Sequence, residues 1–164
     1  MTEDSRPLKY MGYSIVFQEV PNEVSLAFNI SGCPYNCMGC HSGYLKKYDG
    51  KFLMDDLEEL VEHYHWFISC VCFFGGDQNM EELKIALLIV KKYGLKTCLY
   101  TGCNSLEKFK DIFPILNYLK IGGYKHELGG LRSKETNQIM FKIKKGGKVL
   151  ENITHLFQGD KNET

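Results

Sequence analysis

The stretch ISCVCFFGG at residues 68–76 decides the fold of this chain. Residues 68–74 form a nearly continuous apolar run, and the run stops at the glycine pair Gly75-Gly76. Short apolar runs that end in turn residues are typical of strands buried on both faces, as in parallel sheets covered by helices. The stretch therefore predicts an interior strand of an α/β protein.

Helical and strand patterns alternate on both sides of this strand. Apolar residues recur at helical spacing over residues 54–66, which predicts a helix with one apolar face formed by Leu57, Leu60, Val61 and Tyr64. A second helix is predicted over residues 80–93, with Gly94 as its stop signal. Further strands are predicted at residues 13–17, 24–30, 95–102 and 117–123, and a short helix at residues 105–113.

Strands that alternate with helices favour right-handed βαβ units and a mainly parallel sheet. A closed eight-fold barrel takes about 250 residues, whereas this chain has 164. We expect a partial (βα) barrel or an open, mainly parallel sheet with flanking helices, formed by one domain over residues 1–164 with a polar tail at residues 158–164. In both architectures ligands bind at the carboxyl ends of the strands.

The composition fits one compact domain and argues against several partners. The chain is 44% hydrophobic and has 20 basic and 20 acidic residues without a long run of Lys or Arg, so we expect no nucleic-acid or membrane partner. The sequence shows neither an export signal nor an apolar stretch of the ~20 residues that span a bilayer, which predicts a cytoplasmic protein. Seven cysteines in such a chain favour metal ligation or catalysis over disulfides.

Three of the cysteines lie in a loop directly after the strand at residues 24–30, with the spacing Cys33-x3-Cys37-x2-Cys40. Three closely spaced thiolates suit a cubane iron–sulfur cluster in which protein sulfur holds three irons and the fourth stays open to a substrate. Glycines at positions 32, 39 and 43 let the loop curl tightly and point backbone N–H groups at the cluster.

A structural zinc site is the alternative interpretation of the same cysteines, and it needs four ligands in a closed tetrahedron. His41 is adjacent to Cys40, and neighbouring side chains rarely reach one small ion without strain. Cys98 or Cys103 would instead supply the fourth ligand from elsewhere in the chain. The spacing and the position of the three loop cysteines favour the open cluster.

The spacing of Cys33, Cys37 and Cys40 resembles the signature of the radical S-adenosylmethionine enzymes. The resemblance implies one 4Fe–4S cluster on these cysteines, with S-adenosylmethionine chelated to the open iron through its amino and carboxylate groups. An electron from the reduced cluster then cleaves the cofactor into methionine and a 5′-deoxyadenosyl radical. An aromatic residue often precedes the third cysteine in this family, but Gly39 holds that place here, which leaves the adenine contact to Tyr35 or His41.

Three further strand ends resemble cofactor-binding positions of the same family. The sequence FFGGDQ is similar to its Gly-Gly-Glu motif, which implies that the backbone of Gly75 and Gly76 approaches the methionine amino group and that Asp77 replaces the glutamate. The same resemblance implies that Thr101, in YTG, lies near the ribose and methionine, and that Lys120, in YLKIGG, pairs with the methionine carboxylate. The alternatives are ordinary turns at the first two positions and a solvent-facing edge lysine at the third.

The remaining cysteines have other predicted roles. Cys70 and Cys72 share one face of their strand and Cys98 lies within the next strand, so we expect all three to act as small apolar core residues rather than as a second cluster. Cys103 follows a strand end, where it is either a surface thiol or part of a partner-facing site.

The carboxyl-terminal region resembles one branch of the family. The segments ELGGL, residues 127–131, and TNQ, residues 136–138, are similar to those in the activating proteins of anaerobic ribonucleoside-triphosphate reductase. The resemblance implies an enzyme that docks on the large catalytic subunit of that reductase and removes a hydrogen atom from one glycine Cα, with a flavodoxin- or ferredoxin-type reductant as electron donor. The alternatives are an activase of another glycyl radical enzyme, a small-molecule radical enzyme, and a zinc-binding or electron-carrying module.

Overall fold

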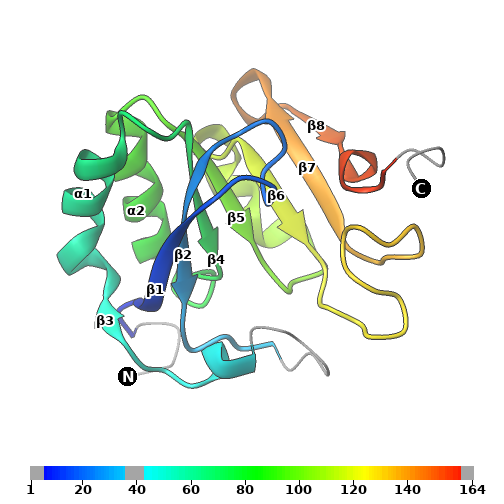
Figure 1. Ribbon diagram of the computed structural model, residues 1–164, viewed down its shortest axis with the longest axis horizontal. Helices are drawn as coiled ribbons and strands as arrows, with labels where there is room; N and C mark the ends of the chain where they lie inside the picture. Colours follow the sequence, from blue (N-terminus) through cyan, green and yellow to red (C-terminus); the bar gives the residue numbers. More distant parts are fainter. Residues whose placement is uncertain (1–5, 36–42, 160–164) are drawn as a thin grey trace.

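The structure, a computed structural model, describes residues 6–35 and 43–159. These residues form an eight-stranded open sheet in the order β3-β1-β2-β4-β5-β6-β7-β8, with β3 and β8 at its edges (Figure 1). The strands are β1 (Lys9–Val16), β2 (Ser25–Ile30), β3 (Lys51–Phe52), β4 (Cys70–Phe74), β5 (Lys96–Tyr100), β6 (Tyr118–Ile121), β7 (Ile139–Lys144) and β8 (Val149–Asn152). The helices are α1 (Leu53–Tyr64), α2 (Met80–Lys92) and the 3₁₀ helices η2 (Gly43–Lys46), η3 (Glu107–Ile115), η4 (Lys145–Gly147) and η5 (Thr154–Phe157).

The centre of the sheet is parallel, as the sequence predicts. β2, β4, β5 and β6 pair in parallel, and the connections between them carry α1, α2 and η3 in turn. The flanks depart from the expected mainly parallel sheet, because the pairings β1–β2, β1–β3, β6–β7 and β7–β8 are antiparallel. The fold is therefore α/β with a mixed, open sheet.

Two segments differ from the elements predicted for them. The short helix predicted at residues 105–113 is the 3₁₀ helix η3, which includes Pro114. A proline has no N–H to donate, and short segments of this kind commonly adopt 3₁₀ geometry. The sequence patterns define no strand bounds beyond residue 123, where a hairpin of β7 and β8 completes the sheet.

One face of the sheet packs against α1, α2 and η3 and forms the larger core. Phe28 of β2 and Phe73 of β4 stack with their ring centroids 5.8 Å apart at the centre of this core. The apolar face predicted for α1 is present, with Leu57 and Val61 fully buried and Leu60 partly buried. Within the described ranges, no helix combines the length and the apolar character needed to cross a bilayer.

The opposite face of the sheet has small side chains at its centre, on β2, β4 and β5. Ala27, Cys70, Cys72 and Cys98 lie there with exposures of 0–1%. Small residues leave room for Val20, which the β1–β2 connection places over them, and the Tyr100 hydroxyl fixes this connection by donating to the Glu19 carbonyl. The three cysteines are therefore buried packing residues, as expected.

The polar tail predicted from residue 158 begins with an anchored side chain. Gln158 donates through Nε2 to the Ser133 carbonyl at 2.9 Å and to the Leu131 carbonyl at 3.3 Å. These bonds hold the end of the described chain against the segment before β7. Residues 160–164 of the predicted tail lie outside the described residues.

Substitution at two neighbouring leucines of α2 tests the packing of the larger core. Leu87 is fully buried and Leu88 is 45% exposed. Leu87→Ala should lower the free energy of unfolding by about 2–5 kcal/mol, because it removes apolar contacts and leaves a cavity. Leu88→Ala should change it by no more than about 0.5 kcal/mol. Urea unfolding of both variants measures the difference, and equal losses would contradict this orientation of α2.

Candidate functional site

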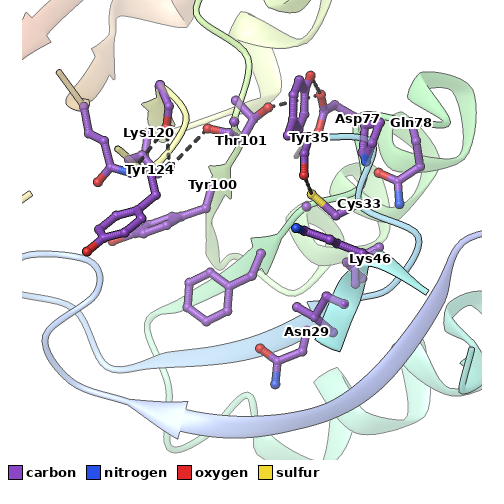
Figure 2. A pocket seen from close by; sticks show the side chains of 18 of the residues that line it. Asn29, Cys33, Tyr35, Lys46, Asp77, Gln78, Tyr100, Thr101, Lys120 and Tyr124 are labelled. Carbon is purple, nitrogen blue, oxygen red and sulfur yellow. Dashed lines mark hydrogen bonds between the residues drawn. The ribbon is translucent and has the colours of Figure 1, made fainter. Parts of the chain in front are cut away.

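A cavity of about 330 Å³ lies where the carboxyl ends of the parallel strands meet (Figure 2). All four strands contribute residues at or just after their ends: Asn29 and Ile30 from β2, Phe74 and Gly75 from β4, Tyr100 and Thr101 from β5, and Lys120 and Gly122 from β6. Small-molecule sites typically occupy about 300–1,000 Å³. The cavity has this size and lies at the edge of the sheet where the sequence predicts ligand binding.

Cys33 reaches this cavity from the loop that follows β2. Its backbone N–H donates to the Leu45 carbonyl at 2.9 Å, and the Gly32 N–H donates to the Lys47 carbonyl at 3.3 Å. The chain thus pairs with itself where it leaves β2 and where it returns through η2. This pairing fixes the half-buried Cys33 at the cavity wall.

The other predicted residues of the cysteine loop, Cys37, Gly39, Cys40 and His41, lie outside the described residues. Among residues 6–35 and 43–159, no three His, Cys, Asp or Glu side chains are placed to hold a metal ion. Two of the three predicted ligands fall outside these ranges, so the metal site stays a prediction. Of the three predicted ligands, Cys33 is the one that the structure describes, and it lines the cavity.

Asp77 also lines this cavity, and its carboxylate is buried, with 3% of the residue exposed. Its Oδ2 accepts hydrogen bonds from the Tyr35 hydroxyl at 2.6 Å, the Thr101 hydroxyl at 3.1 Å and the Lys108 ammonium at 3.1 Å. Burial and the Asp77 carboxylate raise the pKa of Tyr35, which keeps its hydroxyl protonated as a donor. A buried carboxylate needs such partners, and here they come from three different segments of the chain.

The two glycines after β4 face different surroundings. Both have positive φ, 101° at Gly75 and 120° at Gly76, which favours glycine at each position. Gly75 lines the cavity, whereas a Cβ at Gly76 would lie 3.2 Å from Leu83 in the core. The Gly76 N–H donates to Gln78 Oε1 at 3.0 Å. Of the predicted pair, Gly75 is therefore the residue whose backbone meets the cavity.

Lys120 is 8% exposed and lies in β6, between β5 and β7. Its Nζ donates to the carbonyls of Gly122 at 3.0 Å and Thr101 at 3.2 Å, and lies 5.5 Å from the Tyr100 ring centroid. Carbonyl oxygens and an aromatic face offset part of the cost of burying the charge. The interpretation as a solvent-facing edge lysine is wrong, and pairing with a methionine carboxylate stays a prediction.

Several residues of the cavity wall were not predicted from the sequence. They are Glu19, Asn29, Lys46, Phe74, Tyr100, Tyr124 and Gln138. Asn29 and Phe74 occupy the next-to-last and last positions of predicted strands, and Tyr100 lies two residues before the end of another, so their place near the strand ends was a usable signal. Lys46 comes from η2, and Glu19 and Tyr124 come from connections, which no local pattern relates to this cavity. Gln138 ends the TNQ segment, for which the sequence predicts no place at this cavity.

The cavity combines both signs of charge with aromatic rings. Residues of both charges line it: Lys46, Lys120, Glu19 and Asp77. Phe74 and Tyr100 meet edge to face with centroids 5.0 Å apart, and in the view of Figure 2 Tyr100 and Tyr124 lie across the cavity from Cys33. Such a wall suits a small molecule that carries an amino group, a carboxylate and a planar ring.

Comparison of the chain with models of protein families, with curated proteins and with solved structures finds no significant match. A functional proposal for this chain therefore rests on the residues of the cavity and on the motif around Cys33.

Alkylation of the reduced, metal-free protein should separate the described cysteines into two groups. Cys33 and Cys103 are partly exposed, whereas Cys70, Cys72 and Cys98 are buried. Burial also raises the pKa of Cys70 and Cys98, so at pH 8 these two thiols stay protonated and unreactive. Iodoacetamide should label Cys33 and Cys103 in the folded protein and the other three only after unfolding, as read by peptide mass spectrometry. Labelling of Cys98 as fast as Cys103 in the folded protein would contradict this burial.

Proposed function

We propose that this chain is a radical S-adenosylmethionine enzyme that generates a glycyl radical on anaerobic ribonucleoside-triphosphate reductase. The observation that carries the proposal is the position of Cys33, the first cysteine of the Cys33-x3-Cys37-x2-Cys40 spacing, at the wall of a cavity formed by four parallel strand ends. A metal-binding loop and a ligand cavity at the carboxyl edge of the sheet are the two parts that this chemistry needs side by side.

The residues of the cysteine motif and those of the cavity suit the proposed cofactors in their chemistry. Cys33, Cys37 and Cys40 would hold the 4Fe–4S cluster, and thiolates are the ligands that such clusters take. The cavity would hold S-adenosylmethionine, with its carboxylate beside Lys46 and Lys120 and its amino group at the Gly75 backbone. When bound, the reduced cluster supplies one electron and S-adenosylmethionine supplies the group that takes a hydrogen atom from carbon.

The chain's own residues would prepare this site in three ways. Buried charges at Asp77 and Lys120 are already compensated by neighbours, so their positions are set before a ligand arrives. The rings of Phe74, Tyr100 and Tyr124 offer flat surfaces to an adenine. The strand ends and Cys33 form one wall of the cavity, and this wall would keep water from one side of a reactive intermediate.

The open sheet is consistent with a protein substrate. In this proposal the parallel strands belong to a partial (βα) barrel. A second cavity, of about 460 Å³, shares Glu19, Tyr100, Lys120, Tyr124 and Gln138 with the first and continues to Arg132 and Phe157. An opening that extends sideways from the site would admit a segment of a large partner, whereas a small substrate is better enclosed.

Anaerobic reconstitution with iron and sulfide tests the proposal. The wild-type protein should take up about four irons per chain, and S-adenosylmethionine should alter the electron paramagnetic resonance spectrum of the reduced cluster. Incubation with the large reductase subunit, a reductant and S-adenosylmethionine should yield methionine and a glycyl radical signal. Cys37→Ala should lose these signals because it removes a cluster ligand, while Cys103→Ala, outside the motif, should keep its iron.

Other results would point to other functions. A glycyl signal only on a different glycyl radical enzyme, or turnover of a small substrate without any glycyl signal, would contradict the reductase as target but keep the cofactor chemistry. One zinc per chain without iron–sulfur absorbance would contradict the cofactor chemistry itself. In that case Cys37→Ala should prevent folding, since structural zinc sites contribute directly to stability.

A further inference from the structure

The side chain of Tyr35 links the cysteine loop to the ends of β4 and β5 (Figure 2). Tyr35 follows Cys33 by two residues, and the Cys33 thiol donates to the Tyr35 carbonyl at 3.8 Å. The backbone pairing of Cys33 with Leu45 fixes only the base of the loop. Tyr35 adds a second attachment further along the chain, and this attachment has an apolar part and a polar part.

The apolar part is the contact of the Tyr35 ring with Gly102. A Cβ at Gly102 would lie 2.8 Å from Cγ and 2.9 Å from Cδ2 of Tyr35, closer than real Cβ atoms approach other heavy atoms. Gly102 is not among the glycines with positive φ, so its backbone conformation does not by itself require glycine. The lack of a side chain at this position instead leaves space for the Tyr35 ring.

The polar part is the bond from the Tyr35 hydroxyl to Asp77 Oδ2, 2.6 Å long. The same oxygen accepts from Thr101 and from Lys108, each at 3.1 Å. Hydrogen bonds to a charged acceptor are stronger than those between neutral groups. Asp77 therefore joins the cysteine loop, the end of β5 and η3 at one buried atom.

We propose that Tyr35 is a positioning residue that holds Cys33 at the cavity wall, and that Asp77 acts through Tyr35 rather than by direct contact with the methionine amino group. This inference rests on the proposed function in one respect, the assignment of the cluster to the cysteine loop. Asp77 in place of the family's glutamate agrees with the positioning role, since its carboxylate ends within hydrogen-bond distance of the phenol.

The first test uses the metal-free protein, so that it does not depend on the cluster. Tyr35→Phe keeps the ring and removes the hydroxyl, and Tyr44→Phe is the matched control because Tyr44 lies in η2, on the returning side of the same loop, and is 56% exposed. Tyr35→Phe should speed hydrogen exchange of the Gly32 and Cys33 amides, which pair with Lys47 and Leu45, about tenfold or more, the scale expected for loss of a bond to a charged group. Tyr44→Phe should leave that exchange unchanged.

A double-substitution cycle isolates the ring contact. Gly102→Ala should speed the same exchange when Tyr35 is present, because the added Cβ displaces the ring. In a Tyr35→Ala background, Gly102→Ala should have no further effect, since the ring that it would meet is gone. Additive effects of the two substitutions would contradict the proposed contact.

The second test uses the reconstituted protein and separates positioning from direct ligand contact. Tyr35→Phe and Asp77→Asn should each release iron to a chelator about tenfold faster than wild type, with the dissociation constant for S-adenosylmethionine nearly unchanged on the cluster-loaded fraction. Weaker S-adenosylmethionine binding with normal iron release would overturn the proposal and make Asp77 a direct ligand. Failure of the wild type to bind iron would contradict the proposed function, while the exchange test would still decide the role of Tyr35.

Discussion

Parallel pairing of β2, β4, β5 and β6 is the constraint on which the site depends. Parallel neighbours require crossover connections, so the four strands run in one direction and their carboxyl ends meet at one edge. The crossovers carry α1, α2 and η3, which pack on one face and leave the centre of the other to small side chains such as Ala27 and Cys72. Residues far apart in sequence, such as Asp77, Thr101 and Lys120, come together only because of this arrangement.

Two buried charges on this edge show how the chain prepares the site. Asp77 is compensated by Tyr35, Thr101 and Lys108, and Lys120 by two carbonyl groups and the Tyr100 ring. Charged side chains without partners would make the cavity costly to form. Because these partners come from several segments, the contacts of each charge also hold strand ends and loops in place. The same contacts therefore stabilise both the site and the fold.

Sequence patterns predicted the parallel centre of the fold because its strands and helices carry strong local signals. Local patterns identify these elements: the apolar run at residues 68–74, the amphipathic pattern of α1 and the strands that end in glycine. Once the strands are known to be parallel, the topology shows that their carboxyl ends share one edge of the sheet. The antiparallel flanks were harder to predict from the sequence, because the two-residue β3 and the short β7–β8 hairpin show little alternation of apolar and polar residues. Contacts such as Tyr35 with Asp77 depend on packing between distant segments, which a single sequence does not reveal.

The most direct measurement of the central claim is a crystal structure of the anaerobically reconstituted protein with S-adenosylmethionine, with diffraction data collected at the iron absorption edge. The account predicts an anomalous iron signal bound by Cys33, Cys37 and Cys40, and S-adenosylmethionine both on the remaining iron and within the cavity at the strand ends. A zinc ion in the loop, a protein side chain on the fourth iron, or S-adenosylmethionine bound away from this cavity would contradict it.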